Sequence, residues 1–321
     1  MAISDAIHEE RFTFEAGGRA VQTALTMPKG EAPEWGVVIL PGSGPSDVDG
    51  NYPDDPMWPG KSHVYADLGR QLAAQGIAVL RFGRGDSVTV DEAKAAGSRR
   101  FGERTNVAAT AVTTLRERVP GLKKVAVAGH SEGSVVGSLL LTERADLGVR
   151  AFVSLSGPGW RFFDLMLRQA KTYAKKGVLE FGPHKIPVGL YELSVRVVRN
   201  AEPVPEELKD IAVGFHRMPE DVKQYLRDYD AVDNSALFAR VQCPILIVHG
   251  GLDGSVFPDN ADKLMEARCA SPYPTDRADF PDLDHMYKKT EPGNPFAKLD
   301  RQDVDEEVSL RIADWLIALP W

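Results

Sequence analysis

Residues 125–134 read Val-Ala-Val-Ala-Gly-His-Ser-Glu-Gly-Ser. The first four are small and apolar, with valine at alternate positions, which predicts a short buried β-strand. Residues 129–133 then fit Gly-x-Ser-x-Gly, the pattern of a sharp strand-to-helix turn with a serine at its corner. The pattern predicts that the hydroxyl of Ser131 projects from this turn as a nucleophile. It also places the backbone N–H of Glu132 at a helix start, where it can face a developing oxyanion.

Apolar strands alternate with helical patterns on both sides of this motif. Residues 11–28 alternate around Gly17 and Gly18 and predict a β-hairpin. Further strands are expected at 36–40, 77–80, 151–155, 244–248 and near 277–280, and helices at 64–74, 106–119 and 303–318, the last with a capping box at Asp303 and Glu306. Strands that alternate with helices predict an α/β fold with a mostly parallel central sheet flanked by helices.

Residues 159–240 interrupt this rhythm. Strand-like patterns are rare there, and helical patterns occupy 161–175, 187–199 and 219–228. The block is too long for an ordinary crossover loop. We therefore expect a catalytic core of residues 1–158 and 241–321 with a helical cap inserted at 159–240.

Three aromatic residues stand at the entrance to this expected cap. Trp160, Phe162 and Phe163 could line an apolar acyl pocket. The alternative is that they form the small core of the cap itself.

Two further residues complete a possible catalytic set with Ser131. Asp253 lies in a glycine-rich loop directly after the strand at 244–248, at the sheet edge where open α/β folds bind ligands. His285 follows the short strand expected near 277–280. The chain order of nucleophile, acid and base, namely Ser131, Asp253 and His285, is the order found in α/β-hydrolases.

Each of these residues has a plainer alternative. Asp253 could be only a turn residue, and His249 competes with His285 for the role of base, although its place at a strand end favours a structural role. His130 is interpreted as a packing or pocket-wall residue. Asp282 and Asp284, which flank the predicted base, are interpreted as solvated loop carboxylates.

Composition excludes several classes of protein. The chain has 321 residues and a net charge of −8 without a dense basic stripe, so nucleic acid is not an expected partner. It lacks an 18-residue apolar run and a basic-then-apolar leader, so we expect no membrane span and a cytoplasmic location. Cys243 and Cys269 are interpreted as packing residues. The sequence does not indicate an oligomeric state.

No cofactor or metal is expected. The acidic run around Asp47 and Asp49 faintly suggests a metal loop, but it lacks the glycine and terminal glutamate of an EF-hand.

Four stretches together resemble a known family: LPGSGP at 40–45, GHSEGS at 129–134, CPILIVHGGLDGSV at 243–256 and DLDHM at 282–286. The chain resembles α/β-hydrolases of the capped carboxylesterase, lysophospholipase-like and serine aminopeptidase-like group. The resemblance implies a second oxyanion N–H from the loop at 42–44, here that of Ser43. The chain departs from the group in two places, with Val48 where relatives often carry arginine and with a rearranged motif at 81–87.

This reasoning predicts a serine hydrolase that cleaves a small carboxylic ester through an acyl-enzyme on Ser131. A serine peptidase or acyltransferase would use the same first step, and the acidic residues Glu192, Glu206 and Glu207 could hold a peptide amine. A third possibility is a ligand receptor that hydrolyses slowly or not at all.

Overall fold

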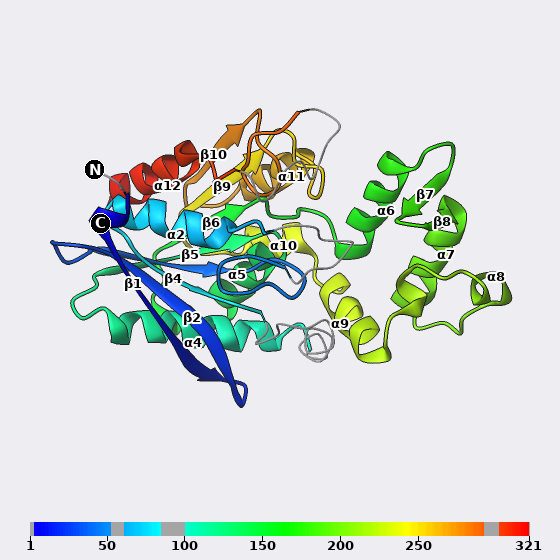
Figure 1. Cartoon of the computed structure of the whole chain (residues 1–321), viewed down its shortest axis with the longest axis horizontal. Coiled ribbons are helices and arrows are strands. Elements are labelled where there is room, and N and C mark those ends of the chain that lie inside the picture. Colours follow the sequence, from blue (N-terminus) through cyan, green and yellow to red (C-terminus); the bar gives the residue numbers. More distant parts are fainter. Residues whose placement is uncertain (1–2, 53–60, 85–99, 292–301, 321) are drawn as a thin grey trace.

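The computed structural model describes residues 3–52, 61–84, 100–291 and 302–320 (Figure 1). An eight-stranded sheet forms its centre, in the order β1-β2-β4-β3-β5-β6-β9-β10. The strands are β1 (Ile7–Ala16), β2 (Arg19–Pro28), β3 (Trp35–Leu40), β4 (Ala78–Phe82), β5 (Lys124–His130), β6 (Ala151–Leu155), β9 (Ile245–Gly250) and β10 (Thr275–Phe280). Strand β2 runs antiparallel to β1 and β4, and the strands from β4 to β10 are parallel to their neighbours. The mostly parallel sheet and the opening hairpin are therefore confirmed.

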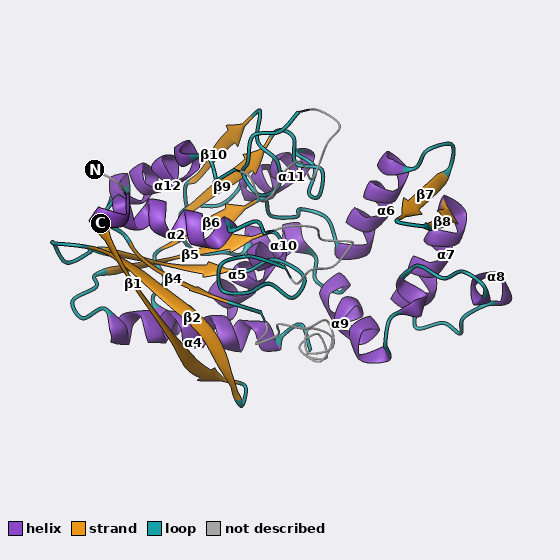
Figure 2. Ribbon diagram, viewed as in Figure 1, coloured by secondary structure: helices purple, strands orange, loops and turns teal. Residues whose placement is uncertain are grey.

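Helices cover both faces of this sheet (Figure 2). In β3, Val37 and Ile39 pack with helices α2 (Val64–Ala74) and α12 (Glu306–Ala318). Val38 and Leu40 point to the other face, where the core includes α4 (Glu103–Arg118), α5 (Glu132–Glu143) and α11 (Asp259–Arg268). Because both faces are buried, the central strands are apolar almost throughout, which made them visible in the sequence.

The segment between β6 and β9 contributes nothing to the large sheet. It holds α6 (Phe162–Tyr173), β7 (Val178–Phe181), β8 (His184–Pro187), α7 (Val188–Arg199), α8 (Glu206–Lys209), α9 (Glu220–Asp230) and α10 (Asn234–Ala239). Figure 1 shows α6 to α9 (green to yellow) beyond one end of the sheet, whereas α10 packs on α5 and α11. We call residues 159–240 the insertion, and its role as a cap stays a prediction.

Three local expectations were wrong. The sequence patterns missed the β7–β8 hairpin, whose inward residues are Leu179 and Ile186 alone, too few for a visible alternation. Helix α12 begins at Glu306, and its cap is Asp305, which accepts from the N–H of Glu307, rather than Asp303. Cys269 is exposed and does not pack in the core, unlike Cys243.

In the part of the chain that the structure describes, the remaining short helices are α1 (Ile3–Ala6) and the 3-10 turns η1 (Ala145–Leu147) and η2 (Phe215–Arg217). Among the residues that the structure describes, no helix has the length and apolar character needed to cross a bilayer. The cytoplasmic location stays a prediction.

Candidate active site

Ser131 occupies a strained corner between β5 and α5. Its backbone has φ 54° and ψ −122°, a combination of angles that residues other than glycine rarely adopt. A Cβ at Gly129 would lie 2.3 Å from the carbonyl oxygen of Gly133, and a Cβ at Gly133 would lie 2.2 Å from that of Leu40. Both glycines are therefore required for the sharp turn that the sequence predicts, and the turn lifts Ser131 out of the strand.

The structure pairs Asp253 with His285. His285 Nδ1 and Asp253 Oδ2 are 2.7 Å apart, and both residues are buried. The other carboxylate oxygen of Asp253 accepts from the N–H groups of Ser255 (2.8 Å) and Val256 (2.7 Å). Every oxygen of this carboxylate thus has a donor, which fixes its orientation toward the imidazole.

Burial and charge act in opposite directions on this pair. Burial raises the pKa of Asp253, but His285, His249 and the N–H of Val256 together lower it by more, so the pKa ends below its ordinary value. Burial lowers the pKa of His285, but the carboxylates of Asp253 and Asp284 together more than offset this, so the pKa of His285 ends above its ordinary value. Asp253 is therefore a carboxylate that accepts from Nδ1–H, which leaves Nε2 as the basic atom of the ring.

Three segments that are far apart in sequence meet at Ser131. The ring of His130, its neighbour, lies 4.7 Å from the ring of His285, and His130 Nε2 is 2.9 Å from the carbonyl oxygen of His285. A Cβ at Gly42 would be 3.2 Å from the Cβ of Ser131, so the loop before Ser43 also reaches the turn. The structure thus brings together the turn, the loop of the predicted base and the loop predicted to stabilise an oxyanion.

The side chain of Glu132 forms a polar cluster that the sequence did not reveal. It is buried, and one oxygen accepts from Ser43 Oγ at 2.6 Å. The other oxygen pairs with Arg104 and Tyr225 and lies 3.4 Å from Arg84 Nη1. Burial raises the pKa of Glu132, but the two arginines and the hydrogen bonds from Ser43 and Tyr225 together lower it by more, to about 2. Glu132 is therefore charged at any working pH.

The same cluster holds the loop at 41–43 by its carbonyl groups. Arg104 donates to the carbonyl of Pro41 at 2.6 Å, and Arg84 donates to that of Gly42 at 3.2 Å. The hydroxyl of Tyr52 donates to the carbonyl of Ser43 at 3.2 Å. With three successive carbonyls held by hydrogen bonds, the peptide N–H groups of the loop are fixed in direction. Arg84 lies in the motif at 81–87 that departs from the family, which was the one sequence signal for this cluster.

His249 and Asp284, which lie near the predicted base, both have structural partners. His249 is fully buried, and its Nε2–H donates to the carbonyl of Val256 at 2.8 Å, whereas Asp253 Oδ2 is 3.6 Å away. Asp282 is exposed, but Asp284 is fully buried, so its interpretation as a solvated carboxylate was wrong. Asp284 accepts from the N–H groups of Met286 (2.8 Å) and Lys288 (3.0 Å) and thereby shapes the turn that carries His285.

The acidic run before α2 is occupied by protein donors. Asp47 accepts from the N–H of Asn51 at 2.8 Å, and Asp49 pairs with Arg11 (2.8 Å) and Arg81 (3.0 Å). Within residues 3–52, 61–84, 100–291 and 302–320, no group of three His, Cys, Asp or Glu side chains is placed to hold a metal ion.

The three aromatic residues at the start of the insertion lie in different surroundings. Trp160 is partly exposed, with Lys263 Nζ 4.2 Å and the Arg168 guanidinium 4.7 Å from its ring centre. Phe163 is fully buried, and its ring lies 5.0 Å from that of Phe162 and 5.4 Å from that of Phe215. This packing belongs to the insertion's own core, and a pocket role for the three residues stays a prediction.

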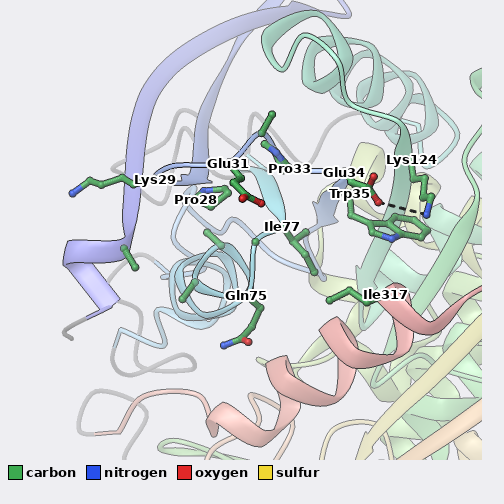
Figure 3. A pocket seen from close by; sticks show the side chains of 15 residues that line it. Pro28, Lys29, Glu31, Pro33, Glu34, Trp35, Gln75, Ile77, Lys124 and Ile317 are labelled. Carbon is green, nitrogen blue, oxygen red and sulfur yellow. Dashed lines mark ion pairs between the residues drawn. The ribbon is translucent and has the colours of Figure 1, made fainter.

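A surface hollow of about 450 Å³ lies elsewhere in the molecule. Figure 3 shows its lining, which includes Trp35, Ile77, Lys124 and Ile317. Trp35 and Lys124 are the first residues of β3 and β5, whereas Ser131 follows the last residue of β5. The hollow is therefore at the opposite edge of the sheet from the candidate site.

The sheet order, the flanking helices and the turn at Ser131 define an α/β-hydrolase fold, and solved structures share it. Est1E from Butyrivibrio proteoclasticus is 14% identical with a TM-score of 0.55, over 96% of this chain and 97% of that one. The acylaminoacyl peptidase of Pyrococcus horikoshii is also 14% identical, with a TM-score of 0.58 over 97% of this chain and 41% of that one.

Residues 60–286, which include Ser131, Asp253 and His285, match the family described as serine aminopeptidase, S33. The chain belongs to this family of α/β-hydrolases. Esterase EstD from Thermotoga maritima is similar to it, with 24% identity over 295 residues that cover 91% of this chain and 64% of EstD. The chain therefore spans less than two thirds of the length of that curated relative. The match supports an esterase-like hydrolase, as the sequence resemblance implied.

Proposed function

We propose that this protein is a serine esterase in which Ser131 attacks a carboxylic ester, His285 is the general base and Asp253 orients and stabilises the imidazole. The observation that carries the proposal is the 2.7 Å contact between Asp253 and His285 beside the strained turn of Ser131. A serine hydroxyl is a weak nucleophile at its free pKa, so a neighbouring base must take its proton. With Nδ1–H bound to Asp253, the Nε2 atom of His285 can do so.

Acylation and deacylation then follow from the same residues. Attack of Ser131 Oγ on the ester carbonyl forms a tetrahedral oxyanion, and collapse releases the alcohol, which receives its proton from His285. Water, deprotonated by His285, hydrolyses the acyl-enzyme. The N–H groups of Ser43 and Glu132 would stabilise both oxyanions, at about 3–4 kcal/mol for each donor in comparable sites. This mechanism calls on no cofactor or metal.

Two contacts of the insertion support its role as a cap over this site. The hydroxyl of Tyr225, on α9, contacts the carboxylate of Glu132 next to the nucleophile. On the other side, Tyr173 of α6 donates to the carbonyl of Gly254, one residue after Asp253. An element held on both sides of the triad is well placed to shape the acyl pocket, with Trp160, Phe162 and Phe163 as the proposed lining.

An ester fits the site better than a peptide with a free amino terminus. An aminopeptidase needs an unpaired carboxylate for the substrate amine, but Glu132 is already paired with arginine. Of the acidic residues considered for this role, Glu192 pairs with Lys171 at 3.3 Å and Glu206 pairs with Lys209 on an exposed helix. Glu207 is exposed on the same helix.

Substrate assays separate the three candidate functions. The purified protein should turn over short p-nitrophenyl esters and leave aminoacyl-nitroanilides intact. Faster turnover of the nitroanilides would favour the peptidase. Absence of turnover for both, with specific ligand binding retained, would favour the receptor.

A further inference from the structure

Two residues outside the proposed triad connect its parts by a continuous chain of hydrogen bonds. The N–H of Gly42, in the loop before Ser43, lies 2.8 Å from the hydroxyl oxygen of Tyr65 on α2. That hydroxyl lies 3.1 Å from His130 Nδ1, and His130 Nε2 lies 2.9 Å from the carbonyl oxygen of His285. Tyr65 and His130 are each only 1% exposed, so water does not compete for these bonds.

The direction of every bond in this chain is fixed by what each atom can do. A carbonyl oxygen only accepts, so His130 Nε2 must carry the hydrogen that faces His285. Burial lowers the pKa of His130 to about 3, so the ring is neutral and Nδ1 must accept. The one hydrogen of Tyr65 therefore goes to Nδ1, and its oxygen accepts from Gly42 N–H.

We propose that Tyr65 and His130 are positioning residues for catalysis. They hold the loop at 41–43 and the backbone of His285 in place relative to Ser131. This rests on the proposed esterase function. One end of the chain fixes the peptide before Ser43, and the other fixes the carbonyl of His285. His130 itself precedes Ser131, so all three reacting segments are tied to one pair of side chains.

The neutral state of His130 is part of this role. Its ring lies 4.7 Å from the ring of His285, which becomes an imidazolium when it accepts the proton of Ser131. A second positive charge at this distance would oppose that step. A buried neutral imidazole provides the two hydrogen bonds without the charge.

Tyr65→Phe tests the proposal by the removal of one oxygen atom. We expect kcat for a p-nitrophenyl ester to fall about 10- to 100-fold, because small misplacements at a reacting centre carry such costs. KM should change by less than about threefold, since the ester is still bound. The matched control is Ser309→Ala, which deletes a buried hydroxyl that bonds to Gln71, a residue of α2 as Tyr65 is. The control should lose stability and keep kcat.

A double-mutant cycle with His130→Phe separates a connected chain from two independent packing residues. If the chain acts as a unit, the double variant loses about as much kcat as the worse single variant. The proposal would be overturned if the kcat losses of the two single variants multiplied in the double variant. A Tyr65→Phe variant with kcat within about twofold of wild type would also overturn it. His130→Asn keeps an acceptor for Tyr65 without the bond to His285, and it replaces the phenylalanine variant if that one does not fold.

A second readout does not depend on esterase activity. In protein with ¹⁵N-labelled histidine, the NMR spectrum should show His130 with hydrogen on Nε2 throughout about pH 5 to 8. Tyr65→Phe should leave the hydrogen on Nε2, because the carbonyl of His285 still requires it, and should shift the resonance of Nδ1, which loses its donor. Hydrogen on Nδ1 in the wild type would overturn the proposal. If the wild type lacks esterase activity, the proposed function fails, whereas the tautomer still tests the hydrogen-bond chain.

Discussion

Burial and neighbouring charges together set the protonation states of the single residues on which the proposed chemistry depends. Glu132 has its pKa lowered to about 2 by two arginines, although burial acts against this. His130 has its pKa lowered to about 3 by burial. The pKa of His285 is raised instead, because the carboxylates of Asp253 and Asp284 together outweigh the effect of burial. Near neutral pH the site therefore holds fixed negative charges at Glu132 and Asp253, one neutral ring at His130 and one ring that titrates, His285.

The titrating ring predicts a pH-dependent rate. His285 accepts a proton only when its Nε2 is free, and its pKa is raised above the ordinary 6.5. The value of kcat/KM should thus rise with pH through a single midpoint at or above that value. Rates measured between about pH 5 and 9 in buffers of constant ionic strength would show this. A flat profile across this range would contradict His285 as the base.

Replacement of Glu132 tests the charged cluster. Glu132→Gln removes the carboxylate and leaves Arg84 and Arg104 without their buried counter-charge. We expect the free energy of unfolding to fall by about 3–5 kcal/mol, together with a loss of kcat as the oxyanion loop loosens. The matched control is Glu34→Gln, which breaks an exposed pair with Lys123 and should leave both quantities unchanged. Equal Tm values for the two variants would refute the cluster's role.

At the scale of elements, the strands near the site could be predicted because they are buried on both faces. Strand β6 occupies the predicted residues, and β5 extends the predicted strand by a residue or two at each end. The β7–β8 hairpin could not be predicted, because only Leu179 and Ile186 of its eight residues are buried. The cap of α12 at Asp305 was missed because Asp303 is followed three residues later by a glutamate, as in a capping box, whereas Asp305 is followed by Val308.

The aromatic residues of the insertion lead to a separate prediction. Trp160→Ala and Phe162→Ala change side chains that are partly exposed, and each should shift the ratio of kcat/KM for short and medium acyl chains by about 10-fold. Phe163→Ala empties a fully buried position and should lower stability by about 3–5 kcal/mol. Turnover of a series of p-nitrophenyl esters and thermal unfolding provide the two measurements. An unchanged chain-length profile in all three variants would mean that the cluster is only the core of the insertion.

At the scale of the whole molecule, the site joins segments that tertiary structure alone brings together. The motif at 129–133 and the chain order of Ser131, Asp253 and His285 could be found in the sequence. Tyr65 and Tyr225 could not, because a tyrosine on a helix carries no local sign of the atom that its hydroxyl contacts. Their contacts cross 65 and 93 positions of the chain.

The protein's acidic loop leads to a prediction about metal removal. Asp47 and Asp49 already have donors from the backbone and from two arginines, so EDTA should leave both activity and Tm unchanged. Loss of activity in EDTA that a divalent ion restores would contradict this.

The most direct measurement is the identification of the residue that carries the acyl group. Wild-type protein treated with a fluorophosphonate should gain the mass of one phosphonyl group, and peptide mapping should locate it on Ser131. Ser131→Ala should fold with the same Tm, remain unlabelled and lose esterase activity by about 10⁴-fold or more. Label on another residue, or a Ser131→Ala variant with activity within about tenfold of wild type, would contradict a mechanism based on Ser131.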